Sequence, residues 1–131
     1  RISHTIAQDE SVPDLCAQAD VLISCYSTTI LEALRIGLPT IIPALNSVDA
    51  TVIEFHFSRY RDNGALYIAS NHQELTDMIS RLDSHPELRD ELRKNARSFI
   101  GSNFCFDGGS SRRVADLVLE LAAKRVSRKL K

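Results

Sequence analysis

A stretch near the start of the chain constrains the fold most, because two apolar runs flank one helical pattern there. Residues 21–25 form an apolar run bounded by polar residues, which is typical of a central strand covered on both faces. Apolar residues recur at helical spacing over Thr29–Ile36, and Gly37 with Pro39 beyond it marks the end of that helix. Thr40–Pro43 is the next strand. The pattern predicts a right-handed βαβ unit.

Strands and helices also alternate on either side of this unit. A short helix over residues 15–19 precedes it, and Ser47 or Asp49 can cap a helix that follows it. The dipeptide at residues 63–64, Asn-Gly, predicts a turn into a further strand over residues 65–69. This order is typical of a parallel sheet with helices on its faces.

The C-terminal part carries helical patterns alone. Asn71 with Glu74 resembles a capping pair that opens one helix, and Ser84 with Glu87 repeats the device for the next. The glycine pair at residues 108–109 predicts a break before a last amphipathic helix.

Together these elements predict an α/β fold with a Rossmann-like parallel sheet flanked by helices and a helical C-terminal part. A chain of 131 residues, 44% of them hydrophobic, can bury a core without metals or disulfides. We expect a single domain over residues 1–131. Because the chain begins at Arg1 on a short strand-like segment, we expect it to be a C-terminal fragment of a two-domain protein.

Composition excludes several classes of function. The formal charge of -1 argues against a nucleic-acid binder with a globally basic surface. None of the four histidines and three cysteines has metal-ligand spacing, so we predict no metal site. Cys16 and Cys25 lie in apolar sequence, where cysteine is usually a small buried hydrophobe. No apolar run approaches the length of about 20 residues that spans a bilayer, and we expect a cytoplasmic location.

The loop between the first predicted strand and the helix that follows it contains the largest group of candidate ligand-binding side chains. Tyr26, Ser27, Thr28 and Thr29 place hydroxyl groups at a helix N-terminus, where backbone N–H groups and the helix dipole attract phosphate. Such loops lie at the carboxyl end of a parallel sheet, where ligands bind. The alternative is simple helix capping, because Thr29 and Glu32 have the spacing of a capping box. Both interpretations fit the spacing.

A resemblance favours phosphate binding. Residues 20–41, DVLISCYSTTILEALRIGLPTI, resemble the nucleotide-binding signature of GT-B glycosyltransferases and related surface-polysaccharide enzymes. The resemblance implies that Ser27, Thr28 and Thr29 hold the donor diphosphate and that Glu32 binds the ribose hydroxyls. The match is weaker but collinear through Asp14 and the two helices that follow residue 70.

Two departures from the family pattern narrow the comparison. Retaining members usually carry two glutamates with seven residues between them, and the position that pairs with Glu32 is occupied by Ser24. The glycine pair of sugar-nucleotide 2-epimerases before the glutamate is absent as well. The remaining pattern resembles inverting GT-B transferases and CDP-glycerol or capsule-type polymerases.

Four further residues are candidates for the cleft. We expect four residues, His4, Tyr26, Asn46 and Ser47, to lie at the same edge of the sheet as Ser27, Thr28 and Thr29. The segment of these last three residues is here named the hydroxyl loop. For His4 the alternative is an ordinary strand histidine, and for Asn46 and Ser47 it is helix capping. No catalytic residue can be assigned.

Two groups of basic residues could contact anions. Arg59 and Arg61 can contact phosphate, or can simply complement the end of a helix. A basic cluster at the end of the chain could touch anionic lipid. Its members are Lys124, Arg125, Arg128, Lys129 and Lys131.

The sequence therefore predicts the donor-nucleotide-binding part of a glycosyltransferase or glycerophosphotransferase in cell-surface polysaccharide biosynthesis. Its partners would be a nucleotide-sugar or CDP-polyol donor and an N-terminal acceptor domain, with no separate cofactor and no nucleic acid. Two alternatives stay open: a non-catalytic Rossmann-like nucleotide- or partner-binding module, and a sugar-nucleotide 2-epimerase-like enzyme. Because base, acceptor and donor must meet in one cleft, we expect no turnover from this chain alone.

Overall fold

The middle strand of the sheet is fully buried. The computed structural model describes residues 6–129, with side chains as far as Arg125. In it, β2 (Thr40–Pro43) pairs in parallel with β1 (Leu22–Ile23) on one side and with β3 (Tyr67–Ala69) on the other. The predicted parallel sheet is confirmed.

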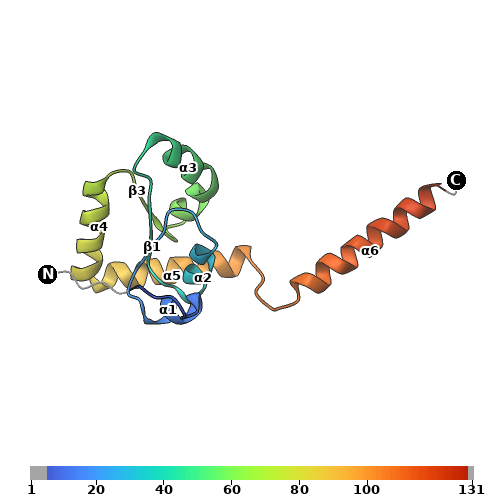
Figure 1. Cartoon of the computed structure of the whole chain (residues 1–131), viewed down its shortest axis with the longest axis horizontal. Coiled ribbons are helices and arrows are strands. Elements are labelled where there is room, and N and C mark those ends of the chain that lie inside the picture. Colours follow the sequence, from blue (N-terminus) through green and yellow to red (C-terminus); the bar gives the residue numbers. More distant parts are fainter. Residues whose placement is uncertain (1–5, 130–131) are drawn as a thin grey trace.

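The helices of the described residues pack around this sheet, except the last, which extends away from it (Figure 1). They are α1 (Val12–Gln18), α2 (Thr29–Ile36), α3 (Ser47–Asp62), α4 (His72–Ser84), α5 (Pro86–Asn103) and α6 (Ser110–Lys129). Because neighbouring side chains of a strand point to opposite faces, Ile42 joins a core with α2, α3 and α5, whereas Ile41 packs with residues of α4 and α5. This arrangement is a Rossmann-like α/β fold with a helical C-terminal part.

The first strand differs from its prediction. We expected a central strand over residues 21–25, but β1 contains two residues and lies at the edge of the described sheet. Ile23 is accordingly 47% exposed. The ladder continues for one further bond, in which the Ser24 N–H donates to the carbonyl of Ile41 at 3.2 Å. An apolar run cannot distinguish an edge strand from a central one, which is why the position was wrong.

Of the two helix caps predicted in the C-terminal part, one is confirmed and one is wrong. The Asn71 side chain accepts the Glu74 N–H at 2.9 Å, so the capping pair that opens α4 is confirmed. The cap predicted at Ser84 is wrong, because α4 continues to this residue and its hydroxyl donates to the carbonyl of Ser80. His85 precedes α5 and makes no side-chain cap bond. Pro86, at the first helical position, has no backbone N–H, so one fewer N–H group at this helix start needs a partner.

The last helix extends away from the other elements (Figure 1). The apolar side chains of its predicted stripe are between 55% and 62% exposed. They belong to Val114, Leu117, Val118 and Leu121. No helix in the described part of the chain has the length and apolar character needed to cross a membrane.

We predict that Gly37→Ala destabilises the fold by at least about 1 kcal/mol, because Gly37 has a φ of 78° that only glycine adopts freely. A Cβ there would also lie 2.7 Å from Nε of Arg97, which donates to the Ile36 carbonyl at the end of α2. Urea unfolding measures the effect. The matched control is Gly101→Ala inside α5, where no atom lies within 4 Å of the added carbon, so stability should rise slightly. Equal effects of the two substitutions would contradict this account.

Candidate functional site

The loop from β1 to α2 is held by its own hydroxyl groups. The Ser27 hydroxyl accepts the Thr29 N–H at 3.2 Å and donates to the Thr29 hydroxyl at 2.9 Å. The N–H groups of Ile30 and Leu31 donate to the carbonyls of Ser27 and Thr28 at 3.2 and 3.0 Å. Ser27 therefore performs the local capping that the sequence pattern assigned to Thr29.

Thr28 occupies the N-cap position but does not cap the helix with its side chain. Within the described residues, its hydroxyl has no hydrogen-bond partner. Glu32 forms no capping box either, because the Thr29 N–H and hydroxyl are both bound to Ser27. The capping interpretation of Thr29 with Glu32 is thus wrong, and the Thr28 hydroxyl stays available at the positive end of α2.

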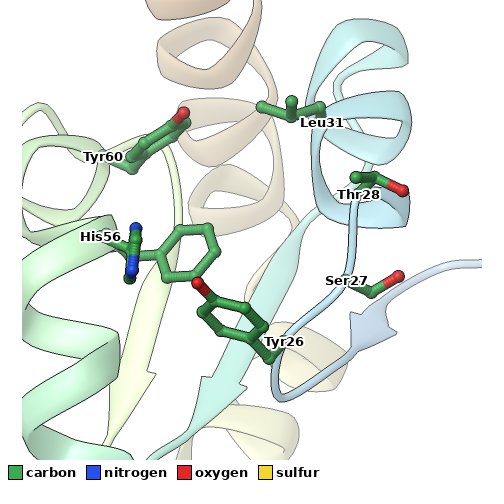
Figure 2. Close-up of a pocket in the computed structure, with 7 residues that line it drawn as sticks. Tyr26, Ser27, Thr28, Leu31, His56 and Tyr60 are labelled. Carbon is green, nitrogen blue, oxygen red and sulfur yellow. The ribbon is translucent and has the colours of Figure 1, made fainter.

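A pocket of about 390 Å³ opens between this loop and α3 (Figure 2). Its lining residues are Tyr26, Ser27, Thr28, Leu31, His56, Phe57 and Tyr60. Figure 2 shows the hydroxyl loop on one wall and the side chains of α3 on the other. Its position at the end of β1 agrees with the rule that ligands of parallel sheets bind at the carboxyl ends of strands.

Aromatic rings form most of the pocket wall. The Tyr26 ring meets the His56 and Phe57 rings edge-on, with centroids 5.4 and 6.1 Å apart. The Phe57 and Tyr60 centroids lie 5.6 Å apart. Burial raises the pKa of Tyr60 above its ordinary value, although the nearby Arg59 opposes the shift. Tyr60 therefore stays neutral at physiological pH and offers its ring and hydroxyl to a ligand.

The structure brings only part of the predicted site together. Tyr26, Ser27 and Thr28 line the pocket, whereas Thr29 lies beside it in the first turn of α2. Glu32 is exposed and is not a lining residue.

Residues three and four apart are neighbours on a helix, so Thr28 lies between Leu31 and Glu32 on the surface of α2. Leu31 faces the pocket, and Glu32 lies on the other flank, near α1. Burial and, after it, the charge of Glu32 raise the pKa of the Cys16 thiol in α1.

The remaining candidates have other positions. Asn46 caps α3 by accepting the N–H groups of Val48 and Asp49 at 3.1 and 2.9 Å, so the cap predicted at Ser47 or Asp49 is wrong. Neither Asn46 nor Ser47 lines the pocket. His4 lies outside the described residues.

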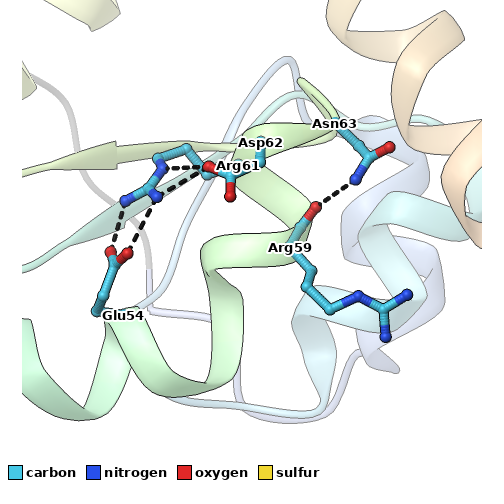
Figure 3. A network of polar contacts seen from close by, with 5 residues as sticks. All are labelled: Glu54, Arg59, Arg61, Asp62 and Asn63. Carbon is cyan, nitrogen blue, oxygen red and sulfur yellow. Dashed lines mark hydrogen bonds and ion pairs between the residues drawn. The ribbon is translucent and has the colours of Figure 1, made fainter.

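The two arginines near the end of α3 interact mainly with protein groups (Figure 3). Arg61 donates hydrogen bonds to the carboxylates of Glu54 and Asp62, and these bonds raise the pKa of its guanidinium. Arg59 donates to the Asn103 side chain at 3.4 Å. The guanidinium groups of Arg59 and Arg61 therefore both have partners within the chain. Among the described residues no cluster of metal-ligating side chains occurs.

Sequence reasoning missed the far wall of the pocket. His56, Phe57 and Tyr60 were not among the candidate site residues that the sequence suggested. The signal was the spacing of His56 and Tyr60, four residues apart on one face of α3. That signal gains meaning only once α3 is known to face the hydroxyl loop.

Comparison with protein families identifies the class of the protein. The sequence model of the family described as Glycosyl transferases group 1 matches residues 2–99. The chain belongs to this family. No curated protein and no solved structure gives a significant match to the chain. Membership supports a glycosyltransferase, which was the first of the predicted functions, and gives no support to the CDP-glycerol transferase subtype.

We predict that iodoacetamide at pH 8 modifies Cys25 and Cys105 in this group 1 glycosyltransferase but spares Cys16. Cys16 is buried, and burial together with the charge of Glu32 raises the pKa of its thiol, so little thiolate is present. Cys25 is exposed, contrary to the prediction that it is a buried hydrophobe. Peptide mass spectrometry after short exposure measures the three sites. Modification of Cys16 as fast as Cys25 would contradict the prediction, and denaturant provides the positive control.

Proposed function

We propose that this chain binds the diphosphate of a nucleotide-sugar donor at the start of α2 and thereby serves glycosyl transfer. The observation that carries the proposal is that Ser27 and Thr28 lie at a helix N-terminus and also line the pocket at the end of β1. Family membership supplies the reaction class. A diphosphate is the anionic part of such a donor and is the group that this position attracts.

The attraction has two physical sources. The Thr28 hydroxyl is an available donor, and the dipole of α2 places partial positive charge beside it. The N–H groups of Thr29, Ile30 and Leu31 already donate within the loop, and a phosphate oxygen can share them in three-centre hydrogen bonds. The same contacts would stabilise the charge that develops on the leaving diphosphate.

The two flanks of Thr28 suggest how the rest of the donor lies. In our proposal the ribose extends toward Glu32, whose exposed carboxylate can accept hydrogen bonds from its hydroxyl groups. The transferred sugar then occupies the pocket on the Leu31 flank, against the rings of Tyr26, Phe57 and Tyr60. Aromatic rings with polar tips suit a ligand that has apolar faces and hydroxyl edges.

Three finer predictions depend on the resemblance over residues 20–41. They are a role in cell-surface polysaccharide synthesis, an acceptor domain that precedes this chain, and contact of the basic C-terminal cluster with anionic lipid. Lys124 of that cluster forms an ion pair with Glu120, which lowers the charge it offers to a lipid surface. Cosedimentation with anionic and neutral vesicles tests the lipid contact.

The first test of the proposed function is binding. Calorimetric titration with UDP, GDP, CDP, UDP-glucose and CDP-glycerol should detect at least one nucleoside diphosphate ligand, and uridine alone should bind much more weakly. Ser27→Ala together with Thr28→Ala should weaken diphosphate binding by about 1 to 3 kcal/mol, because hydroxyl donors are lost while the dipole remains. Uridine binding should hardly change. Unchanged diphosphate affinity in the double variant would end the phosphate assignment.

Thr28→Asp separates anion binding from helix capping. Because Thr28 lies at the positive end of the α2 dipole, the negative charge of an aspartate there should raise the free energy of unfolding by roughly 0.3 to 1 kcal/mol. The same charge should repel a diphosphate and weaken its binding at least tenfold. Thermal unfolding and calorimetry measure the two effects on one sample. Higher stability with unchanged affinity would support capping alone.

Substitutions on the two flanks should affect different parts of the donor. Glu32→Gln should weaken UDP and UDP-glucose alike, because both contain the ribose. His56→Ala should weaken UDP-glucose while leaving UDP nearly unchanged, because only the sugar is expected in the pocket. If His56→Ala weakens both ligands equally, the nucleoside rather than the sugar occupies the aromatic pocket. Arg81→Gln, an exposed substitution on α4, is the control.

A further inference from the structure

The far wall of the pocket is only lightly anchored to the core. α3 contains one fully buried side chain, Ile53, among its described residues, and Phe57 and Tyr60 are half-buried. A surface helix normally fixes its position by burying a whole apolar stripe. Contacts near Tyr60 therefore contribute to the position of α3, and with it to the width of the pocket.

Those contacts come from the end of α5 and the segment after it. The Tyr60 ring lies 4.6 Å from the Phe99 ring and 6.5 Å from the Phe104 ring, measured between centroids. The neighbouring Arg59 donates to the side chain of Asn103 at 3.4 Å. The end of α5 and the segment after it therefore hold the C-terminal half of α3 at Arg59 and Tyr60.

The same segment also reaches the opposite wall. The Phe104 and Phe106 rings have centroids 6.0 Å apart, and the guanidinium of Arg35 in α2 lies 5.0 Å from the centroid of Phe106. Arg35 is one helical turn beyond Leu31, which lines the pocket. Phe104 therefore contacts the helix of one wall and Phe106 contacts the helix of the other.

The far end of this segment is bonded to the start of α6. The Asp107 carboxylate accepts two hydrogen bonds from Arg113, at 2.9 and 2.8 Å, and one from the Gly109 N–H at 2.8 Å. The bonds from Arg113 are the main reason that the pKa of Asp107 lies below its ordinary value. Residues 104–107, here named the aromatic strap, contact the helices of both pocket walls through Phe104 and Phe106.

We propose that Phe104 and Phe106 are positioning residues for donor binding, because they set the separation of α2 and α3. This inference rests on the proposed donor site. Neither residue lines the pocket, so they act through Tyr60 and Arg35. An alternative role is only to cover the core, since Phe104 and Phe106 are 36% and 44% exposed. Covering alone predicts a loss of stability without a loss of affinity.

The test measures affinity at a temperature where every variant is folded. Phe104→Ala and Phe106→Ala should each weaken the best nucleotide-sugar ligand of the titration by about twofold to tenfold, the range expected for one lost aromatic or cation–π contact. Arg35→Gln should act like Phe106→Ala, and the two substitutions combined should cost no more than one. Ile79→Ala, at an exposed apolar residue of α4, and Arg81→Gln are matched controls. Lower melting temperatures with unchanged affinity would overturn the proposal.

A measurement on the ligand-free protein tests the aromatic strap independently of the proposed donor site. In amide NMR spectra of the free protein, Phe106→Ala should shift the signals of residues 26–28 and 56–60, while Ile79→Ala leaves them in place. Because the chain has no tryptophan, Phe104→Trp also adds a single fluorophore to the strap. Unshifted pocket signals would overturn the strap even if donors bind. Shifted signals in a protein that binds no nucleotide would support the strap and refute the donor site.

Discussion

Burial of α2 is the constraint on which the site depends. Ile30, Ala33 and Leu34 are completely buried, so this helix cannot rotate or slide without opening the core. Its C-terminal end is closed by Gly37 and by Arg97, which donates twice to the Ile36 carbonyl. The exposed N-terminus is the part left free for chemistry. A rigid helix thus holds the hydroxyl loop at a fixed height above the sheet.

The adjacent hydroxyl groups of Ser27 and Thr28 differ in their hydrogen bonding. Ser27 is occupied with the N–H and hydroxyl of Thr29, as a capping residue is, whereas Thr28 makes no cap bond. A helix that needed only a cap would gain most from a bonded side chain at its N-cap position. Because Ser27 already provides the cap, the Thr28 hydroxyl makes no cap bond at the positive end of the dipole, where we propose that it binds an anion. This contrast is the structural reason to prefer binding over capping for Thr28.

How far the sequence predicts the molecule depends on how local each signal is. The extents of α2 and β2 were predicted to the residue, because Gly37, Pro39 and the apolar runs act within a few residues. The edge position of β1 was not, since an apolar run does not record how many neighbours a strand has. The near wall of the pocket was found for the same local reason as α2. Its far wall was missed because residues 56–60 meet the loop only through tertiary packing.

The chemistry of the pocket also limits what this chain can do in transfer. No carboxylate is among its lining residues, and Ser24 stands where retaining relatives would place a glutamate. Burial raises the pKa of Tyr60, so this hydroxyl stays protonated at physiological pH. Hydroxyl groups and a helix dipole stabilise negative charge on a leaving group but do not remove a proton from an acceptor. In the function that we propose, this site holds and releases the diphosphate, and activation of the acceptor requires groups beyond those that line the pocket.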